Sequence, residues 1–589
     1  MMKRKLWIPV LLLLAVSFWG CARDETASAF PVCILEDERF RVENNGQWIK
    51  PGEDAVFYLT LEPGYAVAGT DHAGGHSACL KGQTVELRLT DIQYPARIRL
   101  RLTQNFTTVT YCANGGEGPE VTFSYDLSNH ARPNTAIGTD LFFRQGYTMT
   151  GWNTRPDGSG QRIGLGSRVT PDPTGVMLYA QWERWTPESD FEFTVGYGAT
   201  ITGYHGNGDK IVIPQTIQGH RVTGIGHQAF QNCRAGSLIL PDTLCRVAQG
   251  AFQNCEFETV TLFDSIESIS NDSFRECSRL RTVYINAAEE PYGYAYRKES
   301  CYADKVDMLI QAQGQKKLVF YGGCSVWYNL DGAQAEQALA GSRRVINMGL
   351  NGMANSLVQM QILGAFLEEG DILLHAPELS SKPQMMLRTA MDRDDDKLWC
   401  GLEYNYDLVS LVDFQTVAGL LDSFCQYLEQ KEKASDYAAV YTDSRGNRYL
   451  DDWGGIPFER SETMEMLSDP VNLDPDYLQD RGMDTLKRLY AGYLEQGVRV
   501  YISYACVNMD AVAQDQRENG PLMDRLFRDA IAGMDGPVLI SRLEDYLYQN
   551  SDFYDTNYHM RTEVAKRNTA LWLRDLLAQM ARDGLWEGV

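Results

Sequence analysis

The sequence predicts a multidomain protein in which β-rich N-terminal modules precede a short repeat solenoid and a C-terminal α/β domain. Three observations support this fold class. The chain has 589 residues, which is too long for a single hydrophobic core. One motif recurs near the middle of the chain at a fixed interval. Short strand-like runs dominate the first half, whereas strands alternate with amphipathic helices beyond about residue 290.

The N-terminus predicts export. Lys3, Arg4 and Lys5 precede the apolar run 6–19, which is too short to span a bilayer comfortably. Gly20-Cys21 resembles a lipoprotein processing site, which implies a signal peptide over residues 1–21 and a lipid on the Cys21 thiol. Cleavage after Ala27-Ser28-Ala29, giving a secreted protein, is the alternative. No later apolar segment reaches spanning length, so we expect an extracytoplasmic protein, attached to the membrane by its lipid.

The net charge limits the classes of expected partner, and the cysteine content bears on possible disulfides. The formal net charge of −24 argues against nucleic acid or anionic lipid, because phosphate binding requires a basic face. Thirteen cysteines in an exported chain suggest disulfides, yet their spacing does not define any pairing. Nucleotide-binding loops and zinc-protease motifs are absent from the sequence, and no cofactor is expected.

Residues 22–105 predict a small antiparallel β domain. Apolar and polar residues alternate at 55–59 and 98–102, and glycines and prolines separate these runs. A cluster of possible metal ligands lies within this part: Asp71, His72, His76 and Cys79. Its spacing matches no familiar site, so we predict a polar loop and no metal.

Residues 106–185 carry a second module. Its characteristic motifs are Asn114-Gly115-Gly116, the run 144–154 ending in Gly151-Trp152-Asn153-Thr154, the turn residues 157–160 and the closing run 178–182. Asp-Gly and Ser-Gly favour tight turns, and aromatic residues fill a small core. Together these residues resemble the β-grasp repeat of internalin-type surface proteins, whose modules are spacers or adhesive stalks.

Residues 186–288 contain the internal repeat. Phe230-Gln231-Asn232-Cys233 returns as Phe252-Gln253-Asn254-Cys255 and, in altered form, as Phe274-Arg275-Glu276-Cys277, with 255 − 233 = 22 and 277 − 255 = 22. This period lies in the leucine-rich-repeat range, and the motif resembles the BspA-like repeats of bacterial surface antigens. Equivalent positions stack in a solenoid, so the three cysteines predict a buried ladder and not disulfides or metal ligands.

Residues 289–589 predict an open α/β sheet whose ligands bind at the carboxyl ends of the strands. We predict strands at Lys317–Tyr321, Arg344–Met348, Asp371–Ala376, Val498–Tyr504 and Pro537–Ile540. We predict helices at Ala333–Ala340, Ala354–Glu369, Leu522–Ala532 and Arg561–Met580.

A glycine turn follows the first of these strands. The run Gly322-Gly323-Cys324-Ser325, with Asp331 a short way on, resembles the nucleophile motif of SGNH/GDSL hydrolases, in particular their DltD-like branch. Further matching blocks are 347–352, 370–378 and 555–559, and the resemblance covers about residues 316–580. It implies a flavodoxin-like α/β fold and acyl-ester chemistry.

The resemblance implies a catalytic role for Cys324 or Ser325, with His559 as the base and Asp555 as the group that orients it. The family pattern places the acid three residues before the histidine, whereas Asp555 lies four before it. Cys324 fits the distance to Asp331 better, but the family uses serine. Three interpretations stay open: an active Ser325, an active Cys324 and an inactive domain.

Other residues at the predicted sheet rim complete the candidate site. By analogy with the family, the N–H groups of Gly349 or Gly352 are expected oxyanion donors, and Asn351 and Glu378 are expected substrate contacts. His375 ends a strand beside Glu378, where it also fits a pocket wall.

The sequence therefore predicts a surface lipoprotein whose α/β domain is an esterase or acyltransferase for O-acyl groups of envelope or extracellular glycans. The alternative is a non-catalytic adhesin, or a glycan- or protein-binding protein, with a degenerate hydrolase domain. Expected partners are an acylated glycan or polymer, host or cell-surface protein ligands of the repeats, and the membrane through the lipid. Nucleic acid is not expected.

Overall fold

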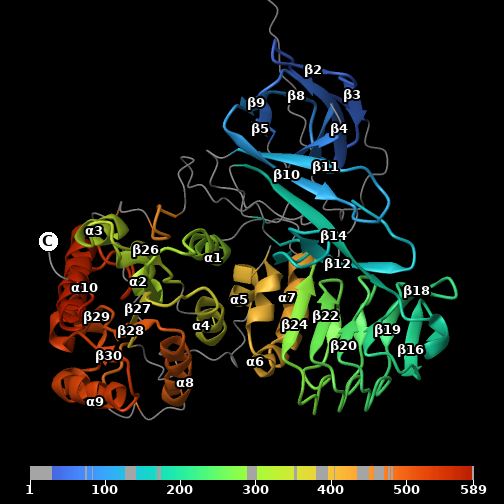
Figure 1. The fold of residues 1–589 in the computed structure, drawn as a ribbon. Helices are drawn as coiled ribbons and strands as arrows, with labels where there is room; N and C mark the ends of the chain where they lie inside the picture. Colours follow the sequence, from blue (N-terminus) through green and yellow to red (C-terminus); the bar gives the residue numbers. More distant parts are fainter. Residues whose placement is uncertain are drawn as a thin grey trace, which may run out of the picture. The chain divides into compact units, whose positions relative to one another are not determined.

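The computed structural model describes residues 29–589 apart from 73–75, 82–83, 127–140, 168, 170–173, 288–300, 351–354, 380–395, 403–404, 434–449, 457–459, 461–469, 475–477, 479–481 and 587–589. The chain divides into two compact units, Met1–Leu102 and Thr103–Val589. Figure 1 shows the β-rich parts in blue to green and the helical C-terminal part in yellow to red. Among the described helices, none is both long and apolar enough for a membrane span.

The first unit is a small β domain, as the alternating sequence predicts. β4 pairs with β7 and β2, β7 pairs with β6, and β1 pairs with β3, all antiparallel, while β1 and β8 are parallel. The inward-facing residues, among them Phe57, Leu59, Leu87 and Leu89, are fully buried. Its strands are β1 Phe30–Ile34, β2 Phe40–Val42, β3 Gln47–Ile49, β4 Glu53–Leu61, β5 Ala66–Thr70, β6 His76–Lys81, β7 Thr84–Ile92, β8 Ala96–Ile98 and β9 Leu100–Thr103, of which β9 ends one residue into the second unit.

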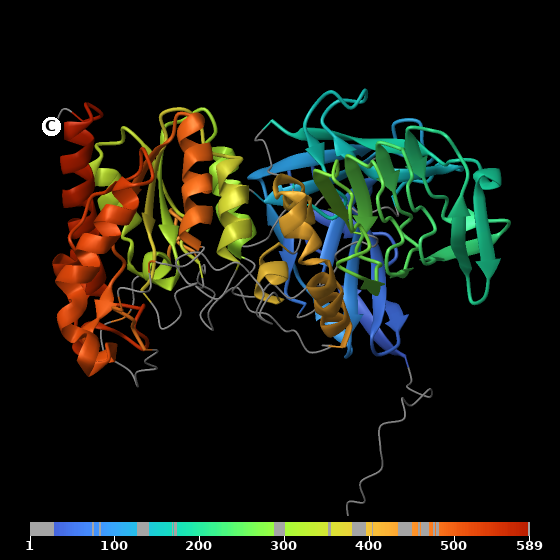
Figure 2. The same ribbon diagram turned by 90° about the horizontal axis from the view of Figure 1, so that it is seen from below.

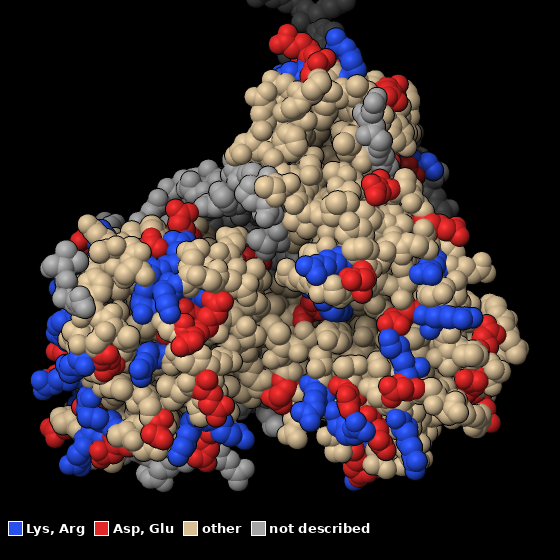
Figure 3. Space-filling view, viewed as in Figure 1, with Lys and Arg blue, Asp and Glu red and all other residues tan. Residues whose placement is uncertain are grey.

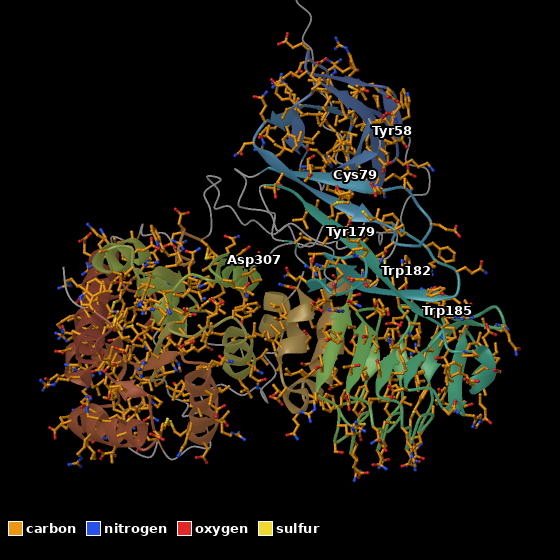
Figure 4. All side chains as sticks on the ribbon, in the orientation of Figure 1. Tyr58, Cys79, Tyr179, Trp182, Trp185 and Asp307 are labelled. Carbon is orange, nitrogen blue, oxygen red and sulfur yellow. The ribbon has the colours of Figure 1, made fainter. Side chains whose placement is uncertain are left out.

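The second unit begins with a mixed sheet. β10 (Phe106–Cys112) is parallel to β14 (Val176–Arg184) and antiparallel to β11 (Val121–Asp126), and β14 is antiparallel to β12 (Tyr147–Asn153), which pairs with β13 (Arg162–Ile163). Figure 4 labels Trp182 and Trp185 on and just after β14. Their indole N–H groups donate to the Ala113 carbonyl and the Thr148 hydroxyl at 2.8 and 2.9 Å, so both rings are fixed by a hydrogen bond.

Short parallel strands form the solenoid, and in Figure 1 they follow one another from right to left between β16 and β24. One sheet has the order β17-β20-β22-β24, and a second contains β15, β16, β19, β21 and β23. Cys255 and Cys277 are buried, and their thiols donate to the carbonyls of Phe230 and Phe252 at 2.9 and 3.0 Å, one repeat apart. Cys255 and Cys277 are therefore buried one above the other as predicted, whereas Cys233, the first of the three predicted positions, is only partly buried. The strands are β15 Phe191–Val195, β16 Ala199–Tyr204, β17 Lys210–Val212, β18 Thr216–Ile217, β19 His220–Ile225, β20 Ser237–Ile239, β21 Arg246–Val247, β22 Thr259–Phe263, β23 Ser268–Ile269 and β24 Thr282–Asn286.

Three helical segments cover the last repeat of the solenoid, and a fourth packs on one of them. Phe230, Phe252 and Phe274 stack in series, with ring centroids 5.5 and 4.9 Å apart, and Phe414 meets Phe274 edge-on at 5.9 Å. A solenoid needs such a cover because its terminal repeat otherwise exposes the core. The segments are α5 Asp396–Leu402, a 3-10 helix at Tyr406–Leu411, α6 Phe414–Ala418 and α7 Leu421–Lys433.

The C-terminal part contains a five-stranded parallel sheet in the order β26-β25-β27-β28-β30. Figure 2 shows this sheet between α10 on one side and α8 with its neighbouring helices on the other. The elements are α1 Cys301–Gln311, β25 Lys317–Gly322, α2 Cys324–Asn329, α3 Gly332–Ala338, β26 Arg344–Asn347, α4 Ser356–Gly364, β27 Ile372–Ala376, α8 Gly482–Glu495, β28 Arg499–Ile502, α9 Gly520–Ala532, β30 Val538–Leu539 and α10 Thr562–Arg582.

All five predicted strands and all four predicted helices are present, with differences at their ends. The helix predicted to reach Glu369 is α4, which ends at Gly364 because the amides of Ala365 and Phe366 turn back onto the carbonyls of Ile362 and Leu363. No pattern in the sequence predicted α1, α2, α8 or the segments that cover the solenoid. On the face shown in Figure 3, acidic and basic side chains are interspersed over much of the visible surface.

Candidate active site at the carboxyl ends of the sheet

Loops at the carboxyl ends of three neighbouring strands meet in the C-terminal part. β25 ends opposite the end of β27, with Gly322 in register with Ala376, and β27 pairs in turn with β28. Cys324 and Ser325 follow β25, Glu378 follows β27, and Cys506 follows β28. Parallel strands place these loops at one edge, which is where open α/β sheets bind ligands.

Two glycines allow the chain to turn sharply from β25 into α2. A Cβ on Gly322 would lie 2.6 Å from the Ala376 carbonyl and from a Val326 methyl group. A Cβ on Gly323, the N-cap residue of α2, would lie 2.4–2.6 Å from the carboxyl atoms of Glu378. A side chain at position 322 would therefore clash with backbone, and a side chain at position 323 would displace the buried Glu378 carboxyl group.

The start of α2 distinguishes the two candidate nucleophiles. Ser325 is fully buried, and its backbone N–H donates to the Glu378 carboxylate at 2.7 Å. The buried Cys506 thiol lies 3.4 Å from its hydroxyl. Cys324, the first residue of α2, is partly exposed. A nucleophile must reach a substrate, so this geometry favours Cys324.

His559 and Asp555 are paired. His559 Nδ1 lies 2.7 Å from Asp555 Oδ1, although the two residues are one position further apart than the family pattern implies. The imidazole also stacks on Tyr328, with ring centroids 3.6 Å apart and planes inclined by 16°. Tyr328 lies one helical turn after Cys324 and so on the same side of α2. The imidazole is therefore held against α2 by its stack on Tyr328.

Asn329 fixes the backbone on both sides of His559. Its side-chain amide donates to the Tyr558 carbonyl at 2.8 Å, and its oxygen accepts the Met560 N–H at 2.9 Å. The side chain is fully buried. The sequence analysis did not identify this residue. A polar residue just before Asp331 carries no local sign that its partners lie more than 200 positions later.

Cys506 and Arg460 were also not identified from the sequence. Burial raises the pKa of the Cys506 thiol to about 12, so this thiol is neutral and serves as a hydrogen-bond donor. Arg460 donates to the carbonyls of Tyr328 and Met560 at 2.5 and 3.1 Å and thereby joins α2 to the segment that carries His559. Both contacts depend on the tertiary fold.

Two expected substrate or oxyanion groups have structural roles. The Gly349 N–H donates to Asn347 Oδ1 at 2.9 Å, so it is not available to an oxyanion in this arrangement. A Cβ on Gly349 would lie 2.3 Å from the backbone nitrogen of Trp327, which shows that the glycine permits close packing on α2. Glu378 is buried beneath the turn and does not lie at an exposed rim. Asn351, Gly352 and Cys21 lie outside the described residues.

His375 belongs to the core of the domain. It is 2% exposed, its Nδ1 lies 2.5 Å from the Tyr490 hydroxyl, and burial lowers the pKa of its imidazole to about 3. This environment does not fit a pocket wall.

The suggested metal ligands in the first unit do not form a site. His72 Nε2 lies 2.8 Å from the Thr90 carbonyl, and the Asp71 carboxylate accepts the Arg99 N–H at 2.8 Å. Within the part of the chain that the structure describes, no group of three or more histidine, cysteine or acidic side chains is arranged to hold a metal.

Comparison with known families identifies the repeats. Residues 204–310 match the BspA type leucine rich repeat region in six copies. Repeats of this type are typical of bacterial surface proteins and suggest a binding or adhesin-like role. A solved T. pallidum leucine rich repeat protein aligns with 17% of this chain and 71% of its own at 21% identity, with a TM-score of 0.12, too low to carry an argument. No curated protein matches the chain.

The match contains more copies than the three found by their common period. Between paired positions of β17, β20, β22 and β24 the spacing is 237 − 210 = 27, 259 − 237 = 22 and 282 − 259 = 23 residues. The first repeat is therefore longer, and a search for one fixed period misses it.

Proposed function

We propose that the chain is a bacterial surface protein in which BspA-type repeats bind a protein ligand and the α/β domain transfers acyl groups. The strand order of the sheet, numbered along the domain, is 2-1-3-4-5, which is the flavodoxin-like order of doubly wound folds. This order supports an SGNH-type domain, with the nucleophile after the first strand and the base before the last helix. We also propose that Cys21 carries a lipid and that residues 106–185 form an internalin-type module.

The observation that carries the acyl-transfer proposal is the contact between His559 and Asp555, with the imidazole stacked on Tyr328 of α2. A carboxylate at Nδ1 holds the imidazole in the tautomer whose Nε2 accepts a proton, and it stabilises the imidazolium that forms. In the proposed reaction the Cys324 sulfur attacks the ester carbonyl while His559 takes the thiol proton. His559 then protonates the departing alkoxide, and water or an acceptor hydroxyl releases the acyl group from sulfur.

The proposed substrates are O-acyl groups of envelope or extracellular glycans. This substrate class comes from the family resemblance, and Asn351 and Gly352 keep their proposed roles as substrate and oxyanion contacts. The second candidate is a non-catalytic adhesin or other surface binding protein. The six repeat copies favour it directly, and so does a cysteine at the position where the family has serine.

Active-site labelling tests the proposal on the full chain. Iodoacetamide labels thiols and a fluorophosphonate labels activated serines, and peptide mass spectrometry locates each label. We expect alkylation of Cys324 that depends on His559, slowing at least tenfold in His559→Ala, and that disappears in Cys324→Ala. Cys245, a partly exposed thiol of the solenoid, is the internal control and should react equally in all variants.

Two results would contradict the proposal. Fluorophosphonate on Ser325 would assign the chemistry to serine. Alkylation of Cys324 at the rate of Cys245, unaffected by His559→Ala, would argue against catalysis and leave ligand binding as the only proposed function.

A further inference from the structure

A buried carboxyl group lies at the start of α2, beside the proposed nucleophile. Glu378 is 4% exposed. Its Oε1 accepts the Ser325 N–H at 2.7 Å, and its carboxyl atoms lie 2.4–2.6 Å from the position of a Cβ on Gly323. Cys324 lies between these two residues in the chain, so the carboxyl group is next to the backbone of Cys324.

The first turn of a helix normally favours a thiolate, because its unpaired N–H groups carry partial positive charge. Here a carboxylate accepts one of those N–H groups and adds a negative charge of its own. This carboxylate therefore disfavours ionisation of the Cys324 thiol, because ionisation would place a second negative charge close to the first. Burial raises the pKa of Glu378, whereas the hydrogen bonds from Ser325 lower it and favour the charged form.

Four other ionisable groups lie around α2. The buried Lys305 ammonium is 5.2 Å from the Trp327 ring and donates to the carbonyls of Asn347 and Gly349, so its charge is directed to the loop after β26. The Cys506 thiol, on the loop after β28, is neutral because burial raises its pKa to about 12. Arg460 is directed to the carbonyls of Tyr328 and Met560 at the far end of α2. The His559 imidazole is coupled to the Asp555 carboxylate, so that pair brings no net positive charge when protonated.

We propose that Glu378 is a positioning residue that anchors the first turn of α2 and keeps the Cys324 thiol protonated in the resting protein. The thiol then loses its proton to His559 when a substrate is attacked. The inference about ionisation depends on the geometry of α2 alone, and its catalytic meaning rests on the proposed function.

The test is the pH profile of Cys324 alkylation by iodoacetamide in the full chain, followed at the Cys324 peptide. Glu378→Gln keeps an oxygen acceptor for the Ser325 N–H and removes the charge. We expect the pKa of Cys324 to fall by about one unit or more, which is roughly a tenfold rise in thiolate at a given pH below that pKa. Glu378→Asp keeps the charge and should leave the pKa near that of the wild type.

Glu544→Gln removes an exposed acid next to Arg542 and is the matched control, with no change expected. An unchanged pKa in Glu378→Gln would overturn the inference, and so would an equal fall in both Glu378 variants, since the effect would then follow packing and not charge. Neither result bears on acyl transfer, which is judged by the dependence of alkylation on His559.

Discussion

Replacing Asn329 with alanine removes the side chain that brackets His559. The Tyr558 carbonyl loses its amide donor and the Met560 N–H loses its acceptor, and both Met560 and the Asn329 side chain are fully buried. We expect the segment carrying His559 to open locally while the sheet stays folded, because the strands do not depend on this amide.

The expected loss of local stability can be estimated from these two hydrogen bonds. Leaving one buried backbone group without its partner costs about 1–3 kcal/mol. The local opening free energy of the segment should fall by at least that amount, which corresponds to a roughly 5- to 150-fold faster amide exchange. Cys324 alkylation should slow to the rate of His559→Ala, since the base is no longer held against α2.

Hydrogen exchange followed by mass spectrometry measures the opening at the peptide containing Met560. Asn568→Ala is the matched control, because Asn568 is equally buried but its side-chain oxygen accepts from the Tyr548 hydroxyl and not from residues 558–560. Wild-type alkylation of Cys324 in Asn329→Ala, together with faster Met560 exchange, would refute the argument that Asn329 positions the base.

Two further predictions concern the sheet and its packing. The folded-state pKa of His375, about 3, lies below the ordinary value of about 6.5, so its contribution to stability is present above pH 6.5 and is lost as the pH falls toward 3. Denaturant titrations should show a loss approaching 5 kcal/mol across that window, with a slope of about 1.4 kcal/mol per pH unit, and His375→Gln should remove this part of the acid sensitivity. Gly349→Ala places a methyl group 2.3 Å from the Trp327 nitrogen and should cost about 3 kcal/mol or more in unfolding free energy. Gly492→Ala, inside α8 with nothing within 4 Å, should instead stabilise the chain by about 0.5–1 kcal/mol, and equal effects of the two changes would contradict the packing argument.

Periodicity predicted the elements that bury one regular face. The strands at 317–322 and 372–376 are apolar runs of the right length, and the 22-residue repeat predicts the cysteine ladder because identical positions stack. The BspA-type repeats are confirmed by the family match. The first copy was missed because its spacing of 27 residues differs from the 22-residue period.

The candidate site was only partly predictable. The sequence proposes Cys324 or Ser325, but the choice depends on where α2 begins, and that is set by the packing of Gly323 against Glu378. The sequence also gives no sign of Asn329, since its hydrogen-bond partners are distant in the chain and are brought to it by α10. Local sequence thus suggests which residues carry chemistry, whereas their orientation comes from tertiary contacts.

Trapping of an acyl intermediate tests the central claim most directly. The full chain is mixed with p-nitrophenyl acetate and quenched in acid, and the acetylated peptide is identified by mass spectrometry. We predict one acetyl group on Cys324 as a hydroxylamine-sensitive thioester, formed at least tenfold more slowly in His559→Ala and Asp555→Asn. Acetylation of Ser325, or acetylation of Cys324 at equal rates in all three proteins, would contradict the account.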